Sequence, residues 1–310
     1  MHLRRNLAIW SNLRLRSRGL EALLLGPFRR GVASKGSLPR SDQEQARGRA
    51  WRSLNEELDQ WQAQGLTAHL WWRDDDVMRP SPKLNRLLDV AQRCSCPVAL
   101  AVIPARVCDG LGQALAGTPT AVVQHGFAHI DHASPGRRKE SSELGSHRPQ
   151  AVILEELVSG RERLRELFGD RFLPVVVPPW NRIDRALLPA LSASGFCGLS
   201  TFGPRDSAIP TEGIVEINCH FEPIRWRGGP HFAGAESVLA VLVSQLRARR
   251  TGAVDPEEPI GLLTHHRNMD DQSWTLVEQL ITFTASHTAA DWLSPVEMFR
   301  TGPRTTQASA

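Results

Sequence analysis

The sequence predicts a single α/β domain with the architecture of a distorted (β/α)7 barrel, and three observations support this prediction. Seven apolar segments of strand length recur between residues 68 and 264. Amphipathic segments of helical length lie between most of them, in the order expected of parallel strands joined by helices. Polar side chains follow the ends of several strands, and parallel barrels place their chemistry at the carboxyl ends of their strands. We therefore expect a closed or partly closed barrel with its functional site at that end.

The folded domain is expected to span residues 42–300 and to begin with a helix. Apolar residues at helical spacing from Trp51 to Trp61 predict this helix, and Gly65 is a typical residue just beyond a helix end. The best marked of the later helices has Ser81 as its N-cap and Pro82 at its first position. The strands are expected at 68–72, 97–103, 120–124, 173–177, 195–200, 213–219 and 259–264. Helices are expected between these strands at 82–93, 151–168, 182–194 and 235–249, and after the last strand at 272–287.

Residues 1–41 differ in composition from the predicted domain. The first 40 residues carry eight arginines and one lysine against one glutamate, and apolar residues from Leu3 to Leu13 lie at helical spacing. This pattern is typical of a basic segment that is either disordered or forms an amphipathic helix at a membrane surface. The other 270 residues carry 28 basic and 32 acidic side chains, so the net charge of +4 comes from the terminus and does not indicate nucleic-acid binding. Residues 301–310 are expected to be a disordered tail.

The five cysteines include one close pair, Cys94 and Cys96, and no C-x-x-C pair. An odd number of cysteines without paired motifs argues against a disulfide framework and against a zinc ribbon. We therefore expect reduced thiols and a cytoplasmic location. No apolar run reaches the length needed to cross a bilayer. Tyrosine is absent, which excludes chemistry based on a tyrosine hydroxyl.

Residues of types that can bind metals or transfer protons follow three of the predicted strands. They are Asp74, Asp75 and Asp76 after the first strand, His125, His129 and His132 after the third, and His265 and His266 after the seventh. Adjacent carboxylates repel one another, and a bound cation relieves that repulsion. Two histidines with one carboxylate form the ligand set of a catalytic zinc site that keeps one position open for water. The spacing of His125 and His129 also resembles H-E-x-x-H, but Gly126 replaces the glutamate, so a protease of that kind is not expected.

Four motifs, in the order in which they occur along the chain, resemble those of the polysaccharide deacetylase (NodB-homology) family of metal-dependent carbohydrate esterases. The resemblance spans about residues 68–268. The matches are Asp75-Asp76 to an Asp-Asp motif, His125-Gly-Phe-Ala-His129 to His-Ser/Thr-x-x-His, Val177-Pro178-Pro179-Trp180 to Arg-Pro-Pro-Tyr, and Leu263-Thr264-His265 to Leu-x-His. The sequences Trp-Arg-Asp-Asp-Asp and His-Gly-Phe-Ala-His are also similar to those of the divergent WalW-like branch.

The resemblance implies a role for each matched residue and an N-acetylated carbohydrate as the substrate. The roles are Asp75 as catalytic base, Asp76, His125 and His129 as metal ligands, Trp180 as oxyanion donor through its backbone N–H, His265 as general acid, and Asn181 and Trp226 as substrate contacts. Zinc is the expected metal, although a set of two histidines and one aspartate also accepts Co, Ni or Mn.

Two departures from the family pattern affect these assignments. Val177 stands where the family has the arginine that orients the base, so either Arg73 or Arg182 replaces it or Asp75 is tuned differently. The Asp-x-x-x-Trp region of the family is matched by Glu222-Pro-Ile-Arg-Trp226, with glutamate in place of aspartate.

The sequence thus predicts a metal-dependent hydrolase that removes an N-acetyl group from an amino sugar or a polysaccharide-related amide and releases acetate. The alternative is a catalytically silent sugar- or metal-binding barrel, motivated by the missing arginine. Three further points stay open at this level. They are whether Asp74, His132 or His266 replaces an assigned residue, whether the loop 133–149 caps the site or is a solvated charged loop, and which oligomeric state the chain adopts.

Overall fold

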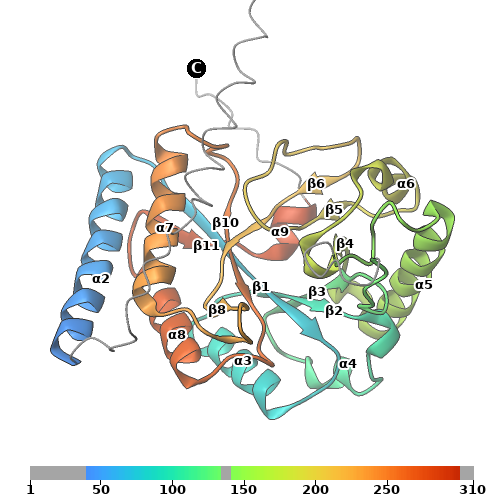
Figure 1. The fold of residues 1–310 in the computed structure, drawn as a ribbon, viewed down its shortest axis with the longest axis horizontal. Coiled ribbons are helices and arrows are strands. Elements are labelled where there is room, and N and C mark those ends of the chain that lie inside the picture. Colours follow the sequence, from blue (N-terminus) through green and yellow to red (C-terminus); the bar gives the residue numbers. More distant parts are fainter. Residues whose placement is uncertain (1–39, 134–140, 301–310) are drawn as a thin grey trace, which may run out of the picture. The chain divides into compact units, whose positions relative to one another are not determined.

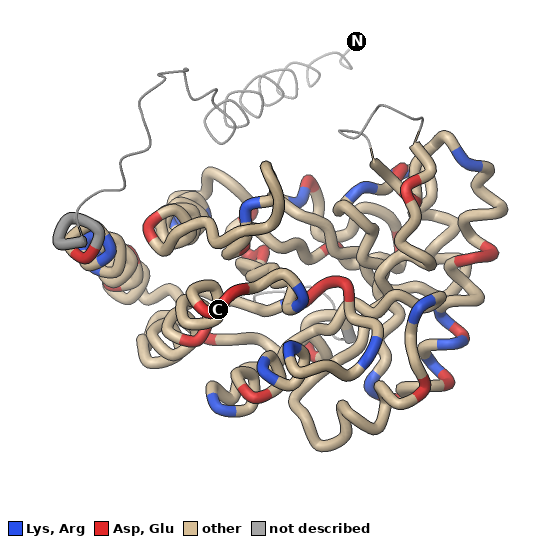
Figure 2. The backbone as a smooth tube through the Cα atoms, turned by 60° about the horizontal axis from the view of Figure 1, so that its bottom comes forward, with Lys and Arg blue, Asp and Glu red and all other residues tan. Residues whose placement is uncertain are grey.

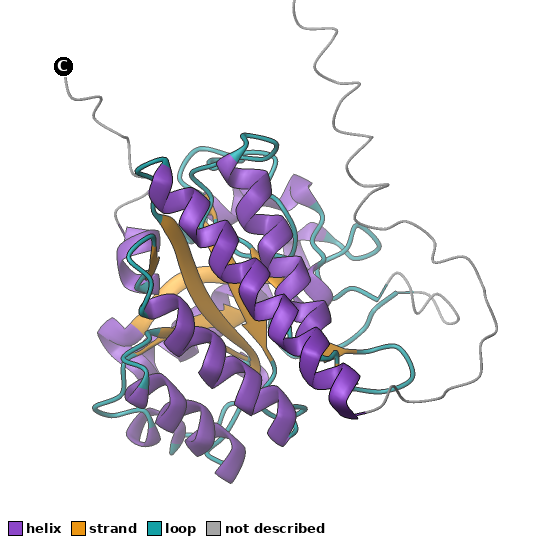
Figure 3. Cartoon of the chain, turned by 90° about the vertical axis from the view of Figure 1, so that its left-hand side faces the viewer, coloured by secondary structure: helices purple, strands orange, loops and turns teal. Residues whose placement is uncertain are grey.

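The computed structural model describes residues 40–133 and 141–300. The predictions of a basic N-terminal segment and of a disordered tail lie outside the described residues, apart from the segment's last two positions, where a helix has already begun. The main sheet is parallel throughout and is surrounded by helices (Figures 1 and 3). Its strands are β1 (Ala68–Val77), β2 (Val98–Val102), β3 (Thr120–His125), β4 (Phe172–Val177), β5 (Gly198–Leu199), β6 (Val215–Glu216), β7 (Cys219–Phe221), β10 (Ile260–Thr264) and β11 (Ala290–Trp292).

The strand order β6-β5-β4-β3-β2-β1-β10-β7 brings the sheet back on itself, because its two outermost strands are consecutive in the chain. β6 pairs with β5, and β7 pairs with β10. Between them, the backbone N–H of Cys219 donates to the carbonyl of Thr201 at 3.0 Å, just beyond β5. The segment 215–221 therefore joins the two edges and curls the sheet into the predicted distorted barrel.

Helices cover the outer face of the barrel. They are α2 (Arg40–Ala63), α3 (Pro82–Arg93), α4 (Leu111–Ala114), α5 (Gln150–Phe168), α6 (Leu188–Ala193), α7 (Ala235–Arg250) and α8 (Asp271–Ala285). The helix α9 (Pro295–Arg300) instead packs on the inner side of the sheet, where Phe299 contacts Trp71 of β1. The helix α3 begins as expected, with the Ser81 hydroxyl accepting from the N–H of Leu84 and with Pro82 at the first position. Four more predicted helices are confirmed as α2, α5, α7 and α8. Most of their ends lie within two residues of the predicted positions, and α2 begins earlier in the chain than predicted.

Alternation along β1 divides the core into an outer and an inner layer. Leu70 and Trp72 pack in the cluster beneath the helices. Trp71 points the other way, into a second cluster that includes Ala99, Val175 and Leu263 from other strands. Because strand side chains alternate, Arg73 and Asp75 continue the inner row that begins at Trp71. The strand thus carries two charged residues up the inside of the barrel.

The structure corrects several of the predicted boundaries. The strand predicted at 195–200 is reduced to β5, and the strand predicted at 213–219 is divided into β6 and β7. β1 continues to Val77, so the three aspartates lie within the strand and do not follow it. The strand is longer because Asp74 still pairs with Leu100 and Thr264 on its two sides. The helix predicted at 182–194 begins later, with the short turn η5 (Arg185–Leu187) followed by α6, because the Asp184 side chain caps the N–H of Ala186.

Several short elements were not predicted from the sequence. A two-stranded antiparallel hairpin is formed by β8 (Ile224–Arg225) and β9 (His231–Phe232), and β11 pairs with the first residues of β1. Strands of two or three residues are too short to leave a periodic signal. The hairpin matters for function because Trp226 follows β8 directly.

No helix in the described ranges is long and apolar enough to cross a membrane. All five cysteines are free thiols, as predicted, while the cytoplasmic location stays a prediction. Basic and acidic residues are interspersed along the described chain (Figure 2).

Candidate active site

A cavity of about 480 Å³ opens at the carboxyl ends of the barrel strands. All eight residues that the sequence assigned to the site line this cavity, namely Asp75, Asp76, His125, His129, Trp180, Asn181, Trp226 and His265. Arg182, Phe202, Glu222 and Leu263 are the other described residues that line it. The residues chosen by the strand-end rule therefore come together in one cavity, although Phe202, two residues beyond a predicted strand, was not singled out.

Left-handed backbone conformations concentrate around the cavity. Of the five non-glycine residues with positive φ in the described ranges, four line it: Asp76, His129, Trp180 and Asn181, with φ between 55° and 67°. Such conformations cost free energy and cluster at functional sites. At Asp76 the pairing of β1 with β2 also changes register. This bulge turns the Asp76 side chain away from strict alternation and toward the histidines.

Asp76, His125 and His129 form the one potential metal-binding group found among the described residues. Their ligand atoms all lie within 4.8 Å of one another. The Nε2 atoms of His125 and His129 lie 3.4 and 3.3 Å from Oδ1 of Asp76. Nδ1 of His125 lies 2.9 Å from the carbonyl of Val177, so its N–H donates there and Nε2 faces the carboxylate. This arrangement fits a divalent metal. The hydrogen bond from Nδ1 fixes the orientation of the His125 ring, as is usual for a histidine that binds a metal through its other ring nitrogen.

The charges in this group are strongly coupled. Burial lowers the pKa of His125, but Asp75 and Asp76 outweigh it and the pKa is raised above its ordinary value. Burial also opposes ionisation of Asp76, yet the neighbouring histidines, His125 above all, hold its pKa well below the usual range. The pKa of His129 is lowered by burial and by His125. A proton on His125 therefore competes with a metal for this site.

Asp75 is held by Arg73 from the same strand. The guanidinium donates from Nε to Oδ1 at 2.8 Å and from Nη2 to Oδ2 at 3.0 Å. Arg73 is fully buried, and Asp75 raises its pKa against the opposing effect of burial. It also donates to the Ser200 hydroxyl at 2.7 Å and to Oδ1 of Asn181 at 2.7 Å. Of the alternatives for the missing arginine at Val177, the structure thus supports Arg73.

Glu143 organises the loop between the two candidate histidine ligands. Its buried carboxylate accepts from the backbone N–H groups of Phe127 at 3.0 Å and Ala128 at 2.8 Å. Gly126 has φ of 54°, and a Cβ there would collide with Oε2 of Glu143 and lie 2.7 Å from the Pro179 ring. The residue at the family's Ser/Thr position is therefore glycine because the Glu143 carboxylate fills that space. The sequence named Glu143 only as a member of a charged loop.

His265 lines the cavity beside Glu222 and Trp226. Its ring packs edge-on against Trp226, with centroids 4.7 Å apart. Nδ1 is buried and has no hydrogen-bond partner in the described part of the chain, and Oε2 of Glu222 is 3.8 Å away. Burial lowers the pKa of His265 against the effect of the nearby aspartates. Burial, aided by Asp75, raises the pKa of Glu222 to about 7.

Three large aromatic side chains stand at the mouth of the cavity. Trp180, Phe202 and Trp226 are 36%, 42% and 44% exposed. Trp180 packs against His129 with ring centroids 4.5 Å apart, and the indole N–H of Trp226 lies 3.1 Å from both oxygens of Glu222. Exposed aromatic faces beside a polar cavity suit a ligand with both apolar and hydrogen-bonding surfaces.

The residues named as alternatives do not line this cavity. Asp74 accepts from the Thr264 hydroxyl at 2.6 Å and lies 2.5 Å from Nδ1 of His266, on the outer side of the strands. His132 is exposed. The expectation that His266 packs outside the barrel is confirmed.

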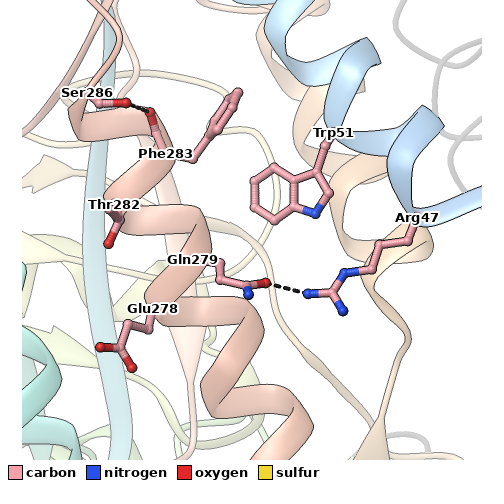
Figure 4. Close-up of a pocket in the computed structure, with 7 residues that line it drawn as sticks. All are labelled: Arg47, Trp51, Glu278, Gln279, Thr282, Phe283 and Ser286. Carbon is pink, nitrogen blue, oxygen red and sulfur yellow. Dashed lines mark hydrogen bonds between the residues drawn. The ribbon is translucent and has the colours of Figure 1, made fainter. Parts of the chain in front are cut away.

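A second hollow, of about 550 Å³, lies between α2 and α8 (Figure 4). Trp51 and Phe283 pack together there with ring centroids 5.1 Å apart, and Arg47 donates to Gln279. Its wall is mainly apolar and contributes none of the metal-binding group, so the barrel cavity is the candidate active site.

No protein-family model matches this chain, and no curated protein matches it. Among solved structures, it resembles a Mycobacterium smegmatis protein assigned to the polysaccharide deacetylases, with 16% identity, 79% of this chain and 96% of the other covered, and a TM-score of 0.57. It also resembles a peptidoglycan N-acetylglucosamine deacetylase solved with a benzamide ligand, with 11% identity, 77% and 91% coverage and a TM-score of 0.50. The chain has the fold of polysaccharide deacetylases, which confirms the resemblance at the level of the fold. The WalW-like branch stays a prediction.

Proposed function

We propose that the protein is a metal-dependent deacetylase of the NodB-homology type, which hydrolyses an N-acetyl group of an amino sugar or a related amide and releases acetate. One observation carries the proposal. In a single cavity, a carboxylate held by a buried arginine lies beside a group of two histidines and one aspartate, with a further histidine, His265, in the same lining. These are the parts that hydrolysis of an unactivated amide requires.

Asp76, His125 and His129 would hold the metal, and zinc suits this donor set. When bound, such a metal supplies Lewis acidity for a carbonyl and for water. The chain's own residues would provide the rest of the chemistry. Asp75 would take a proton from the attacking water, and Arg73 keeps its two oxygens oriented for that transfer.

Amide cleavage also requires stabilisation of the developing oxyanion and protonation of the leaving group. As the water oxygen bonds to the acetyl carbon, negative charge develops on the carbonyl oxygen, and the backbone N–H of Trp180 would donate to it. His265 would then protonate the amine nitrogen as the C–N bond breaks. The products are acetate and a free amine. The exposed rings of Trp180, Phe202 and Trp226 would contact the sugar.

The alternative of a catalytically silent binding barrel was motivated by Val177 at the arginine position. Arg73 weakens that motive, because it holds Asp75 from within β1. The variant Asp75→Asn separates the two functions. It should abolish turnover in an enzyme, whereas in a binding protein it should leave ligand affinity nearly unchanged.

The proposal is tested by measuring metal content and acetate release together. Wild type, purified without chelators or a histidine tag, should contain close to one equivalent of divalent metal, and Asp76→Ala combined with His125→Ala almost none. Metal-loaded wild type should release acetate from at least one member of a panel of acetylated sugars, sugar nucleotides and oligosaccharides. No hydrolysis across that panel at full metal occupancy would refute the deacetylase proposal.

A further inference from the structure

A polar cavity of about 620 Å³, separate from the hollow between α2 and α8, adjoins the cavity of the candidate active site. The two cavities share Asn181 and Arg182 in their linings. Thr201 lines the second cavity and the next residue, Phe202, lines the first. A substrate seated over Asp75 and His265 can therefore extend past Arg182 into the second cavity.

Unlike Arg73 and Arg185, Arg182 has no carboxylate partner in the described ranges. Arg73 is paired with Asp75, and Arg185 binds both oxygens of Glu216 at 3.2 and 2.7 Å. The exposed Arg182 makes one hydrogen bond with a described residue, from Nη1 to the carbonyl of Ser141 at 2.9 Å. This bond anchors the side chain and leaves Nε and Nη2 for another acceptor.

A second, independent feature of this cavity is an unsatisfied hydroxyl. Ser142 is 6% exposed, and its Oγ is buried with no hydrogen-bond partner among described residues. Burying a polar group without a partner is unfavourable, so rotation of the Ser142 side chain toward the cavity that it lines would give the hydroxyl a ligand atom or a water as its partner. Among the described residues that line the cavity, the one carboxylate is that of Asp184, whose Oδ1 already accepts from the N–H of Ala186.

We propose that Arg182, with Ser142, forms a subsite for an anionic group, a carboxylate or a phosphate, on the sugar that carries the acetamide or on its neighbour. This inference rests on the proposed function and narrows its substrate class. A guanidinium with two free donor positions matches the paired oxygens of either anion, and such charge-assisted hydrogen bonds are stronger than neutral ones. An uncharged acetylated sugar would leave this arginine without a partner.

The test compares substrates that differ only in the anionic group. N-acetylglucosamine is the neutral probe, N-acetylmuramic acid adds a carboxylate, and N-acetylglucosamine 6-phosphate adds a phosphate. With metal-loaded wild type, we expect kcat/KM to be about 10-fold to 100-fold higher for at least one anionic probe, mainly through a lower KM. The two anionic probes distinguish a carboxylate from a phosphate as the preferred group.

In Arg182→Gln, the preference for the anionic probe should fall to near one. Arg163→Gln is the matched control, since it removes an exposed arginine that lines neither cavity. An equal loss in both variants would indicate general electrostatic attraction and overturn the subsite. Equal turnover of neutral and anionic probes by wild type would also overturn it.

Binding gives a readout that does not depend on turnover. Calorimetric titration of wild type and Arg182→Gln with the same three sugars should show tighter binding of an anionic probe that depends on Arg182. If no sugar is hydrolysed but this binding is seen, the deacetylase proposal fails and the subsite stands. If N-acetylglucosamine is hydrolysed and no anionic probe binds more tightly, the subsite fails alone.

Discussion

Arg73 and Asp75, two positions apart on the same strand, are joined inside the barrel by two hydrogen bonds of 2.8 and 3.0 Å. Both side chains point inward because strand residues alternate, and among the described residues Asp75 is the one carboxylate that the fully buried guanidinium pairs with. The pair places an oriented carboxylate next to the candidate metal ligands. It does so from within one strand, whereas the family pattern takes the arginine from the position that Val177 occupies here.

The two hydrogen bonds from Arg73 to Asp75 predict that a positive charge at this position is not sufficient to replace the arginine. Arg73→Lys keeps the positive charge but cannot donate to both oxygens of Asp75, so we expect kcat to fall about 100-fold with metal content unchanged. Steady-state kinetics and elemental analysis of the same preparation measure both quantities. Arg86→Lys, at an exposed ion pair with Asp271, is the control and should keep full activity. Unchanged kcat in Arg73→Lys would show that Asp75 does not need this orientation.

The position of His265 outside the metal-binding group predicts that metal and activity can be separated. His265→Ala should keep about one equivalent of metal and lose about 100-fold to 10,000-fold in kcat, the range expected for removal of a general acid. Asp76→Ala should lose the metal itself. Metal analysis after gel filtration distinguishes the two variants, and metal loss in His265→Ala would contradict the assignment.

Glu143 and Gly126 are predicted to support metal binding through the loop conformation. Glu143→Gln keeps the shape but places an amide N–H₂ against backbone donors, so metal affinity should fall about 10-fold to 100-fold. Gly126→Ala should have a stronger effect, because its Cβ has no room and φ is 54°. Competition with a chromogenic chelator measures the affinities. Gly117→Ala is the matched control, since that glycine also has positive φ but nothing lies within 4 Å of a Cβ there.

The raised pKa of Glu222 predicts a pH dependence of stability in the metal-free protein. Burial raises this pKa to about 7 from a usual value of 4.5, so between these pH values the folded state holds a proton that the unfolded state has released. Stability attributable to Glu222 therefore falls as pH rises through this window, by at most about 3 kcal/mol. Glu222→Gln should gain in melting temperature relative to wild type between pH 4.5 and pH 8. The same difference between the two proteins at both pH values would argue against a protonated Glu222.

The sequence by itself determined the alternation of strands and helices, the helices with clear caps and the residues that meet in one cavity at the strand ends. Hydrophobic periodicity needs only local spacing, and strand ends in a parallel barrel meet at one rim, so Asp75, His125 and His265 were found without coordinates. Local signals also account for helix α3, where Ser81 and Pro82 fix the start.

Only the tertiary structure decided which partner each polar residue takes. The sequence left open whether Arg73 or Arg182 replaces the missing arginine or whether Asp75 is tuned differently. The barrel interior brings Arg73 to Asp75, while Arg182 lines both cavities. The sequence assigned Glu143 no particular role, because its contact with the loop at Gly126 spans some fifteen residues of chain. Such contacts join residues that are far apart in the chain and meet only when the strands and loops pack together. The local spacing of residues carries no information about that packing.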